Sequence, residues 1–183
     1  MHGVFLRKFD YRRDLDLLRV SMLESRDRHL FSYNIPINTF QDFEKWISEC
    51  MKSYYHDFYM ICTEDVSNAV GFIYSFDYSN EDLHCKICAY ICPKYRKCAL
   101  GGFAIIQFLD MMFMSYPLRK VYSTVFSYNN HSRLSALNAG FREEAVLKEF
   151  KYYNGVFSDM CILSITRENF YSRFKTILED DDD

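Results

Sequence analysis

The sequence has few residues that break regular structure, and it has no long apolar run. Only 3 of its 183 residues are proline and 6 are glycine, which argues against a disordered or collagen-like chain. No apolar stretch approaches the roughly 20 residues of a membrane helix. Charged residues also stand where a signal peptide needs its apolar segment. We therefore expect a soluble, cytoplasmic protein without a membrane partner, whose 7 cysteines are free thiols.

A large excess of charge is lacking as well. The formal net charge is −3, but residues 179–183 are all acidic, so the rest of the chain is near neutral or slightly basic. This balance disfavours a nucleic-acid partner, which needs an extended basic surface. We expect residues 1–178 to form one domain and residues 179–183 to be a solvated, disordered acidic tail.

Apolar and aromatic residues are abundant, and their spacing predicts the order of the elements. Hydrophobic residues make up 49% of the chain, which is ample material for one core. The patterns predict strands at 4–10, 57–63, 69–79, 82–92 and 118–127, helices at 15–25, after Thr39, at about 102–115 and after Asn129, and a final hairpin turning at Asn154–Gly155. A strand–helix–strand unit in the middle implies one parallel pair. The expected fold class is mixed α/β, with a mainly antiparallel sheet.

The segment "PKYRKCALGGFAIIQFLDMMF", residues 93–113, joins a strand to a helix. It presents Arg96 and Lys97 just before a helix that opens at Gly101 or Gly102. A helix N-terminus offers unpaired N–H groups and partial positive charge, and glycine lets a ligand approach the backbone closely. These features suit a phosphate, but they also suit an ordinary surface connection. The segment alone leaves both interpretations open.

The surrounding order of motifs resembles the Gcn5-related N-acetyltransferase (GNAT) superfamily. Residues 96–101, "RKCALG", are similar to the loop that holds the pyrophosphate of acetyl-CoA in that family, with Ala99 in place of its first glycine. The downstream segment "NNHSRLSALNAGF" and the Asn-Gly turn resemble the RimJ/RimL-like branch. The positions that match that branch are Asn129, Ser132, Gly140, Phe141, Asn154, Gly155 and Asp159. The resemblance covers most of residues 4–167.

This resemblance implies a cofactor site and a reaction. The strand at 87–92 would splay from the strand at 120–127, and the pantetheine arm of acetyl-CoA would enter the gap. The residues implied for cofactor binding are Tyr90, Ile91, Cys92, Arg96, Lys97, Cys98, Ala99, Leu100, Gly101, Gly102, Asn129 and Ser132. A substrate amine would attack the thioester directly, so the chain would be an acyltransferase with acetyl-CoA as co-substrate.

The sequence offers one candidate for the residue that accepts a proton from the attacking amine, together with alternatives. His84 is the candidate base, because it shares a strand face with Lys86 and Tyr90 and because imidazole exchanges protons near neutral pH. A purely structural His84 and a water relay from Glu81 or Asp82 stay open as alternatives.

Ser132 is the candidate for contacting the thioester sulfur. Lys86 and Ala136 stand where many relatives carry Glu and Tyr. Together with Ala99, these departures keep a non-catalytic CoA-binding protein as an alternative. Among acceptors, the sequence favours a small amine or an amino sugar, and a protein N-terminus is the alternative. A homodimer also stays open.

Two cysteine patterns could indicate other chemistry, namely metal binding or nucleophilic catalysis. Cys85 and Cys88 have Cys-x-x-Cys spacing, but a strand directs them to opposite faces, so we expect no metal. Cys98 beside two basic residues lacks an evident supporting base for nucleophilic catalysis. Several early aromatic residues are expected in the core, with one or two lining the acceptor pocket. They are Phe31, Tyr33, Trp46, Tyr54 and Tyr55.

Overall fold

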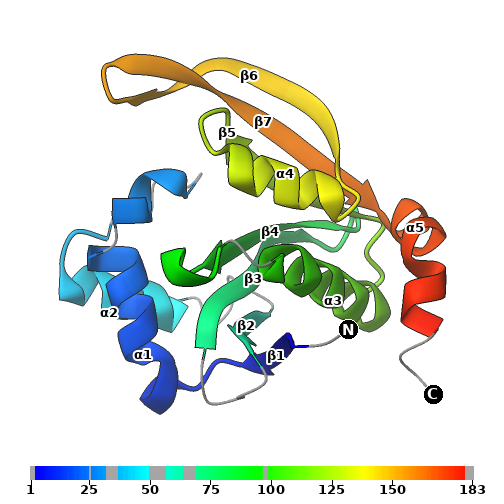
Figure 1. Ribbon diagram of the computed structural model, residues 1–183, viewed down its shortest axis with the longest axis horizontal. Coiled ribbons are helices and arrows are strands. Elements are labelled where there is room, and N and C mark those ends of the chain that lie inside the picture. Colours follow the sequence, from blue (N-terminus) through cyan, green and yellow to red (C-terminus); the bar gives the residue numbers. More distant parts are fainter. Residues whose placement is uncertain are drawn as a thin grey trace.

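A seven-stranded sheet in the order β1-β2-β3-β4-β5-β7-β6 forms the centre of the computed structural model (Figure 1). The structure describes residues 3–24, 26–31, 37–49, 57–63, 69–96 and 99–179. Its strands are β1 (Phe5–Lys8), β2 (Phe58–Cys62), β3 (Ala69–Ser79), β4 (His84–Ile91), β5 (Lys120–Phe126), β6 (Arg142–Tyr153) and β7 (Val156–Thr166). Neighbouring strands are antiparallel except for β4 and β5, which are parallel. The expected mixed α/β class is confirmed.

Helices cover both faces of this sheet. Their bounds are α1 (Tyr11–Arg19), η1 (Val20–Glu24), η2 (Arg26–Leu30), α2 (Phe40–Glu49), η4 (Pro93–Tyr95), α3 (Leu100–Ser115), α4 (Asn130–Asn138) and α5 (Arg167–Glu179). One core cluster joins α3 and α5 to one face, and a second joins α1, η1 and α2 to the other. Within the described residues, no helix is long and apolar enough to span a membrane.

Alternation along β4 assigns its side chains to these two cores. Cys85 belongs to the cluster beneath α3, whereas Cys88 packs against the cluster beneath α1 and α2. The two thiols of the Cys-x-x-Cys pattern therefore lie on opposite faces of the sheet, as the strand periodicity predicts. Burial raises the pKa of Cys85 to about 12 and that of Cys88 to about 11, so both behave as small core residues.

Local capping signals account for most helix starts. Asn129 caps α4 by accepting a hydrogen bond from the Ser132 amide at 3.3 Å. Thr39 and Asp42 cap α2 reciprocally, since the Thr39 hydroxyl accepts from the Asp42 amide and the Asp42 carboxylate accepts from the Thr39 amide. The Asn154–Gly155 turn has positive φ at both residues and joins β6 to β7 as expected.

Three helices differ most from the sequence expectations, while several strand ends differ by one or two residues. Helix α1 begins at Tyr11 rather than 15, because Asp10 accepts the amides of Arg12 and Arg13 and so starts the helix one turn earlier. Helix α3 begins at Leu100 rather than near Gly102. The patterns predict no helix after β7, yet α5 covers Arg167–Glu179 and so includes Glu179, a residue that the sequence places in the acidic tail. Residues 180–183 lie outside the described residues.

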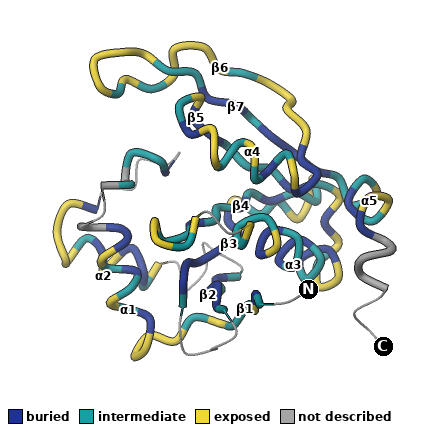
Figure 2. Tube along the Cα trace, in the orientation of Figure 1, coloured by how far each residue is buried: buried dark blue, intermediate teal, exposed yellow. Residues whose placement is uncertain are grey.

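The β6–β7 hairpin extends away from the rest of the molecule (Figure 1). Residues near its turn are exposed, whereas the middle of β3 is buried (Figure 2). Asp159, which matched the RimJ/RimL-like pattern, accepts hydrogen bonds from the Glu149 amide at 2.9 Å and from Lys148 at 2.8 Å. These bonds lie at the irregularity in β6, where Glu149 has positive φ, so Asp159 stabilises a bulge in the hairpin.

Candidate active site

The two parallel strands of the sheet separate soon after they begin. Their pairing joins His84 to Lys120, Cys85 to Val121 and Lys86 to Tyr122. Beyond these pairs β4 continues to Ile91 and β5 to Phe126 without pairing to each other. The backbone groups of the later part of β4 that face β5 are therefore available to a ligand. This separation is the gap that the sequence resemblance implied.

The N-terminus of α3 lies next to the open end of this gap. A Cβ atom added at Gly101 would lie 3.5 Å from Cγ1 of Ile91, the last residue of β4, and one added at Gly102 would meet nothing within 4 Å. The first turn of the helix offers backbone N–H groups, which carry partial positive charge. Open space and N–H donors together fit the phosphate-bearing arm of CoA. Lys97 and Cys98 lie outside the described residues.

Ala99, the residue that departs from the family pattern, is the N-cap of α3. Its φ of 52° and ψ of 0° place it in the left-handed region, where glycine is favoured. Its carbonyl accepts hydrogen bonds from the amides of Gly102 at 3.0 Å and Phe103 at 3.3 Å. The loop thus keeps a geometry suited to glycine even though this chain carries alanine.

Arg96, the expected phosphate partner, contacts the end of β4 and a carboxylate of η2. Its Nε donates to the carbonyl of Ile91 at 2.8 Å, and its two terminal nitrogens lie 2.5 and 3.3 Å from the carboxylate of Asp27. Its guanidinium also lies 5.4 Å from the ring centre of Tyr90. The guanidinium therefore holds a carboxylate from η2 in the position where a phosphate was expected.

The remaining cofactor residues of β4 contribute backbone rather than side chain. Tyr90 is buried and packs against the rings of Phe31 and Phe72 in the core. The amide of Cys92 donates to Val70 at 2.8 Å, so it is already used within the sheet. Burial raises the pKa of the Cys92 thiol, which makes it a weak nucleophile. The carbonyl of Ile91 is bound by the Arg96 side chain rather than by a neighbouring strand.

On the opposite side of the gap, Asn129 and Ser132 start α4. Asn129 is buried, and its side-chain oxygen holds the Ser132 amide. Ser132 itself is partly exposed in the first turn, just after β5. The structure therefore brings Ser132 and the start of α3 to the two sides of one opening.

His84 lies at the closed end of the gap. It pairs with Lys120, two residues before the last paired position of β4, and its ring meets that of Tyr122 edge-on at 5.5 Å. Its Nδ1 is buried without a hydrogen-bond partner, and its Nε2 lies 4.0 Å from Asp82. Lys86, which stands where relatives carry Glu, is bound instead to Asp77 at 2.7 Å.

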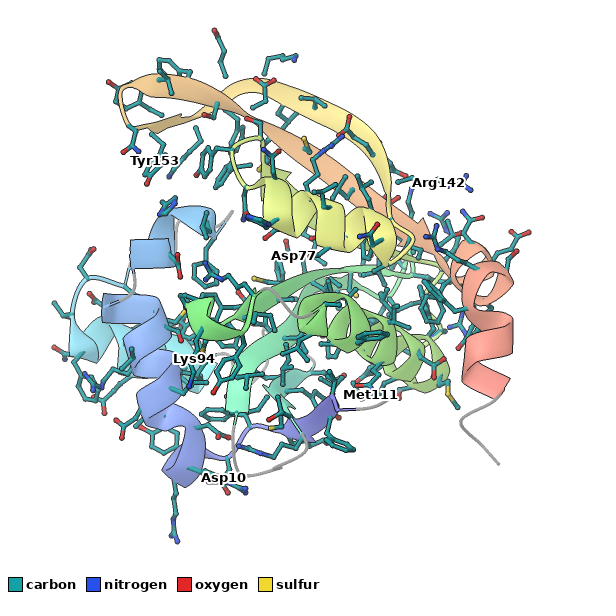
Figure 3. The ribbon with its side chains drawn as sticks, viewed as in Figure 1. Asp10, Asp77, Lys94, Met111, Arg142 and Tyr153 are labelled. Carbon is teal, nitrogen blue, oxygen red and sulfur yellow. The ribbon has the colours of Figure 1, made fainter. Side chains whose placement is uncertain are left out.

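Three aromatic residues that the sequence did not single out meet beside the open end. His29 of η2 stacks on Tyr153 of the hairpin with ring centres 4.4 Å apart, and Tyr128 packs 5.1 Å from Tyr153. The Tyr128 hydroxyl donates to the His29 carbonyl at 2.6 Å. Figure 3 shows Tyr153 on the side of the hairpin that faces η2. Of the aromatics expected here, Phe31 and Trp46 are core residues, and Tyr33, Tyr54 and Tyr55 lie outside the described residues.

Comparisons with known proteins agree with this architecture. The chain is 26% identical over 143 residues to the SPbeta prophage-derived uncharacterized N-acetyltransferase YokL of Bacillus subtilis, covering 78% of this chain and 79% of the relative. The structure matches the spermidine N-acetyltransferase of Vibrio cholerae in complex with CoA and spermine with a TM-score of 0.78 at 20% identity, over 91% and 97% of the two chains. It matches a probable GNAT-family acetyltransferase of Chromobacterium violaceum with a TM-score of 0.74 at 20% identity, over 93% and 86%. No protein-family model matches the chain.

The sheet, the separating parallel pair and these structural matches define the fold of the protein. The chain has the fold of the GNAT-superfamily N-acetyltransferases. The GNAT fold expected from the pyrophosphate-loop pattern and the downstream Asn-x-x-Ser helix is thereby confirmed.

Proposed function

We propose that the protein transfers an acetyl group from acetyl-CoA to a primary amine of a small molecule. The observation that carries this proposal is the separation of β4 and β5 beyond Lys86 and Tyr122, with the N-terminus of α3 at the open end. A thioester arm placed in this gap would have its phosphates at the helix start. The nitrogen of the acceptor would attack the thioester carbon directly, and the CoA thiolate would leave.

The residues of this chain have distinct parts in the proposal. The first turn of α3 binds phosphate, and the backbone of β4 near Ile91 orients the arm. The attacking nitrogen must lose a proton, and His84 at the closed end of the gap is the group proposed to accept it. Ser132, at the start of α4, is proposed to donate a hydrogen bond to the leaving sulfur.

The acceptor class rests on the relatives and on the open end of the gap. A solved neighbour binds spermine, a small amine, together with CoA. In this chain the Asp27 carboxylate and the rings of His29, Tyr128 and Tyr153 surround the same end, and such groups attract a cationic amine. The resemblance to the RimJ/RimL-like branch supports a protein N-terminus as the second acceptor class.

A loop variant with a matched control tests the cofactor assignment. Gly101→Trp places an indole against Ile91 at the open end of the gap, so binding of CoA, measured by titration calorimetry, should be lost. Met114→Trp adds the same group at the other end of α3, where the side chain is 76% exposed, and should bind CoA normally. Equal CoA affinity in both variants would contradict the assignment. Release of free thiol from acetyl-CoA with small amines or with N-terminal peptides then identifies the acceptor class.

A further inference from the structure

The short helix η2 is attached at one point to the end of β4. Asp27 of η2 accepts hydrogen bonds from the guanidinium of Arg96 at 2.5 and 3.3 Å, and it lies 3.4 Å from the hydroxyl of Tyr90. Arg96 also donates to the carbonyl of Ile91, the last residue of β4. Tyr90 belongs to the core on the α1 and α2 face. Asp27 is therefore held against the end of β4 on the face of the sheet opposite α3.

The same helix also contacts the end of β5. The His29 carbonyl accepts a hydrogen bond from the Tyr128 hydroxyl at 2.6 Å, and the two rings lie 5.9 Å apart. Tyr128 stacks on Phe126, the last residue of β5, with ring centres 5.4 Å apart. Phe126 points away from the α3 core, because it alternates with Val125, which belongs to that core. The contacts of Asp27 and His29 therefore lie on one face of the sheet, at the ends of the two strands that separate.

The tip of the β6–β7 hairpin adds a third contact. The ring of Tyr153 stacks on His29, with ring centres 4.4 Å apart and planes 4° apart, and it lies 5.1 Å from the ring of Tyr128. In Figure 1 the hairpin tip reaches over η2. The neighbouring Tyr152 contacts Phe157 instead and is 62% exposed, because successive residues of a strand point to opposite faces. Tyr153 therefore contacts η2, whereas Tyr152 points away from it.

These contacts join the two parts of the sheet that β4 and β5 leave apart. We use the name η2 strap for Arg26–Leu30 together with Tyr128 and Tyr153. The pairing of β4 with β5 ends at Lys86, and the strap connects the far ends of the same two strands. On this face the gap is bordered by paired strands at one end and by the strap at the other. Its length along β4, residues 87–91, is about 16 Å at roughly 3.3 Å per residue.

We propose that the η2 strap selects the acceptor by length, so that the amine of a small molecule is acetylated and an extended peptide is excluded. This inference rests on the proposed acetyl transfer and deepens it. Because α3 packs on the opposite face, the acceptor approaches from the face that the strap borders. An extended peptide advances 3.3–3.6 Å per residue, so six residues span about 20 Å, which exceeds the length of the gap. Such a chain must pass the strap, whereas a single amino-acid amide fits before it.

Several independent contacts hold the strap in place. Burial raises the pKa of Tyr128 to about 12, so its hydroxyl keeps its proton and stays a donor to the His29 carbonyl. The stacked rings of His29 and Tyr153 shield each other from water. At the other end, charge-assisted hydrogen bonds hold Asp27. Passage of a peptide disrupts these contacts, and its backbone offers no ring or charge that would replace them.

Two acceptors with the same reacting group test the selection. Alaninamide and a hexapeptide amide, with an N-terminal alanine followed by glycine and serine, share one α-amino group and differ in length. The ratio of kcat/KM for alaninamide to that for the hexapeptide, measured by thiol release from acetyl-CoA, should be at least tenfold in the unaltered chain. Tyr153→Ala should lower this ratio at least fivefold. Tyr128→Phe, which removes one hydrogen bond and keeps the ring, should lower it less, and Tyr153→Phe should keep it.

Tyr152→Ala is the matched control, because it removes the same group from the adjacent residue on the other face of the hairpin and should keep the ratio. Thermal unfolding checks that each variant is folded. A preference of the unaltered chain for the hexapeptide, or a ratio that Tyr153→Ala leaves unchanged, overturns the inference while leaving acetyl transfer intact. An equal loss with both acceptors assigns the ring a purely structural role and overturns it too.

The remaining outcomes separate this inference from the proposed function. If other small amines are acetylated but alaninamide is not, something other than length excludes the α-amine, and the inference fails while the proposed function stands. If the unaltered chain releases no thiol from acetyl-CoA with any small amine, the proposed function fails, and this inference fails with it.

Discussion

Replacing Ala99 with glycine tests the one residue of the loop that departs from the family pattern. Ala99 has φ 52° and ψ 0°, and a residue with a Cβ atom held in this left-handed region costs roughly 1–2 kcal/mol. Glycine removes that cost but loses about 0.5–1 kcal/mol through its greater freedom in the unfolded chain. The difference predicts that Ala99→Gly raises the free energy of unfolding by roughly 0.5–1 kcal/mol.

Scanning calorimetry measures this gain as a change in Tm. In a domain of this size 1 kcal/mol corresponds to about 2–4 °C, so Ala99→Gly should raise Tm by roughly 1–4 °C. Ala145→Gly is the matched control, because Ala145 is exposed in β6 and is not among the residues with positive φ. That variant should lower Tm, since glycine weakens a strand. A similar fall in both variants would refute the argument that the left-handed backbone at Ala99 costs stability.

Two further predictions concern the closed end of the gap and the sheet beside it. His84→Gln should lower kcat by roughly 10²–10⁴-fold, because it removes the proposed base. It should leave CoA affinity unchanged, because the loop before α3 stays intact. An unchanged kcat would show that another group accepts the proton. Hydrogen bonds from Lys120 and then Ser164 lower the pKa of Glu144, so its stabilisation is full above the unfolded value of about 4.3 and is lost as pH falls through the lowered value. Glu144→Gln should therefore reduce the free energy of unfolding at pH 7, by less than about 1 kcal/mol because the pair is partly solvated, and should match the parent chain near pH 3. A difference of equal size at both pH values would contradict this reading.

Elements with strong local signals could be predicted from the sequence. The Asn154–Gly155 turn needs positive φ at both residues, and few other dipeptides adopt this conformation readily. The Asn-Gly dipeptide therefore predicts the hairpin by itself. Asn129 likewise marks the start of α4, because its side chain replaces a missing helix partner. Each of these signals depends on neighbouring backbone alone, which is why tertiary structure did not alter them.

Two local sequence signals mark helix α5, namely apolar residues at helical spacing and an N-cap. Phe170 and Phe174 are one turn apart and both are buried in the core beneath α3. The Thr166 hydroxyl accepts from the Asn169 amide at 3.2 Å, as an N-cap does. The periodicity of the two phenylalanines and the cap together identify a helix after β7.

The proposed cofactor site has a short sequence signal because backbone groups recognise phosphate. A helix start and residues with small or absent side chains must be consecutive in the chain, so the requirement appears as a short motif around Ala99 and Gly101. Even so, the motif did not reveal that Arg96 binds the carboxylate of Asp27. That contact depends on where η2 lies, and nothing near Arg96 in the sequence specifies it.

The acceptor side depends on side chains that only the folded sheet brings together. Asp27 and His29 come from η2, Tyr128 follows β5, and Tyr153 ends β6. No spacing links these residues, because each is placed by a different strand or helix, and the stack of His29 on Tyr153 spans most of the chain. A cofactor site that binds its ligand through backbone groups can keep the same motif in proteins that use different acceptors. A site that binds its ligand through dispersed side chains can change acceptor by substitutions that leave that motif intact, so we expect acceptor specificity to depend on side chains outside the loop.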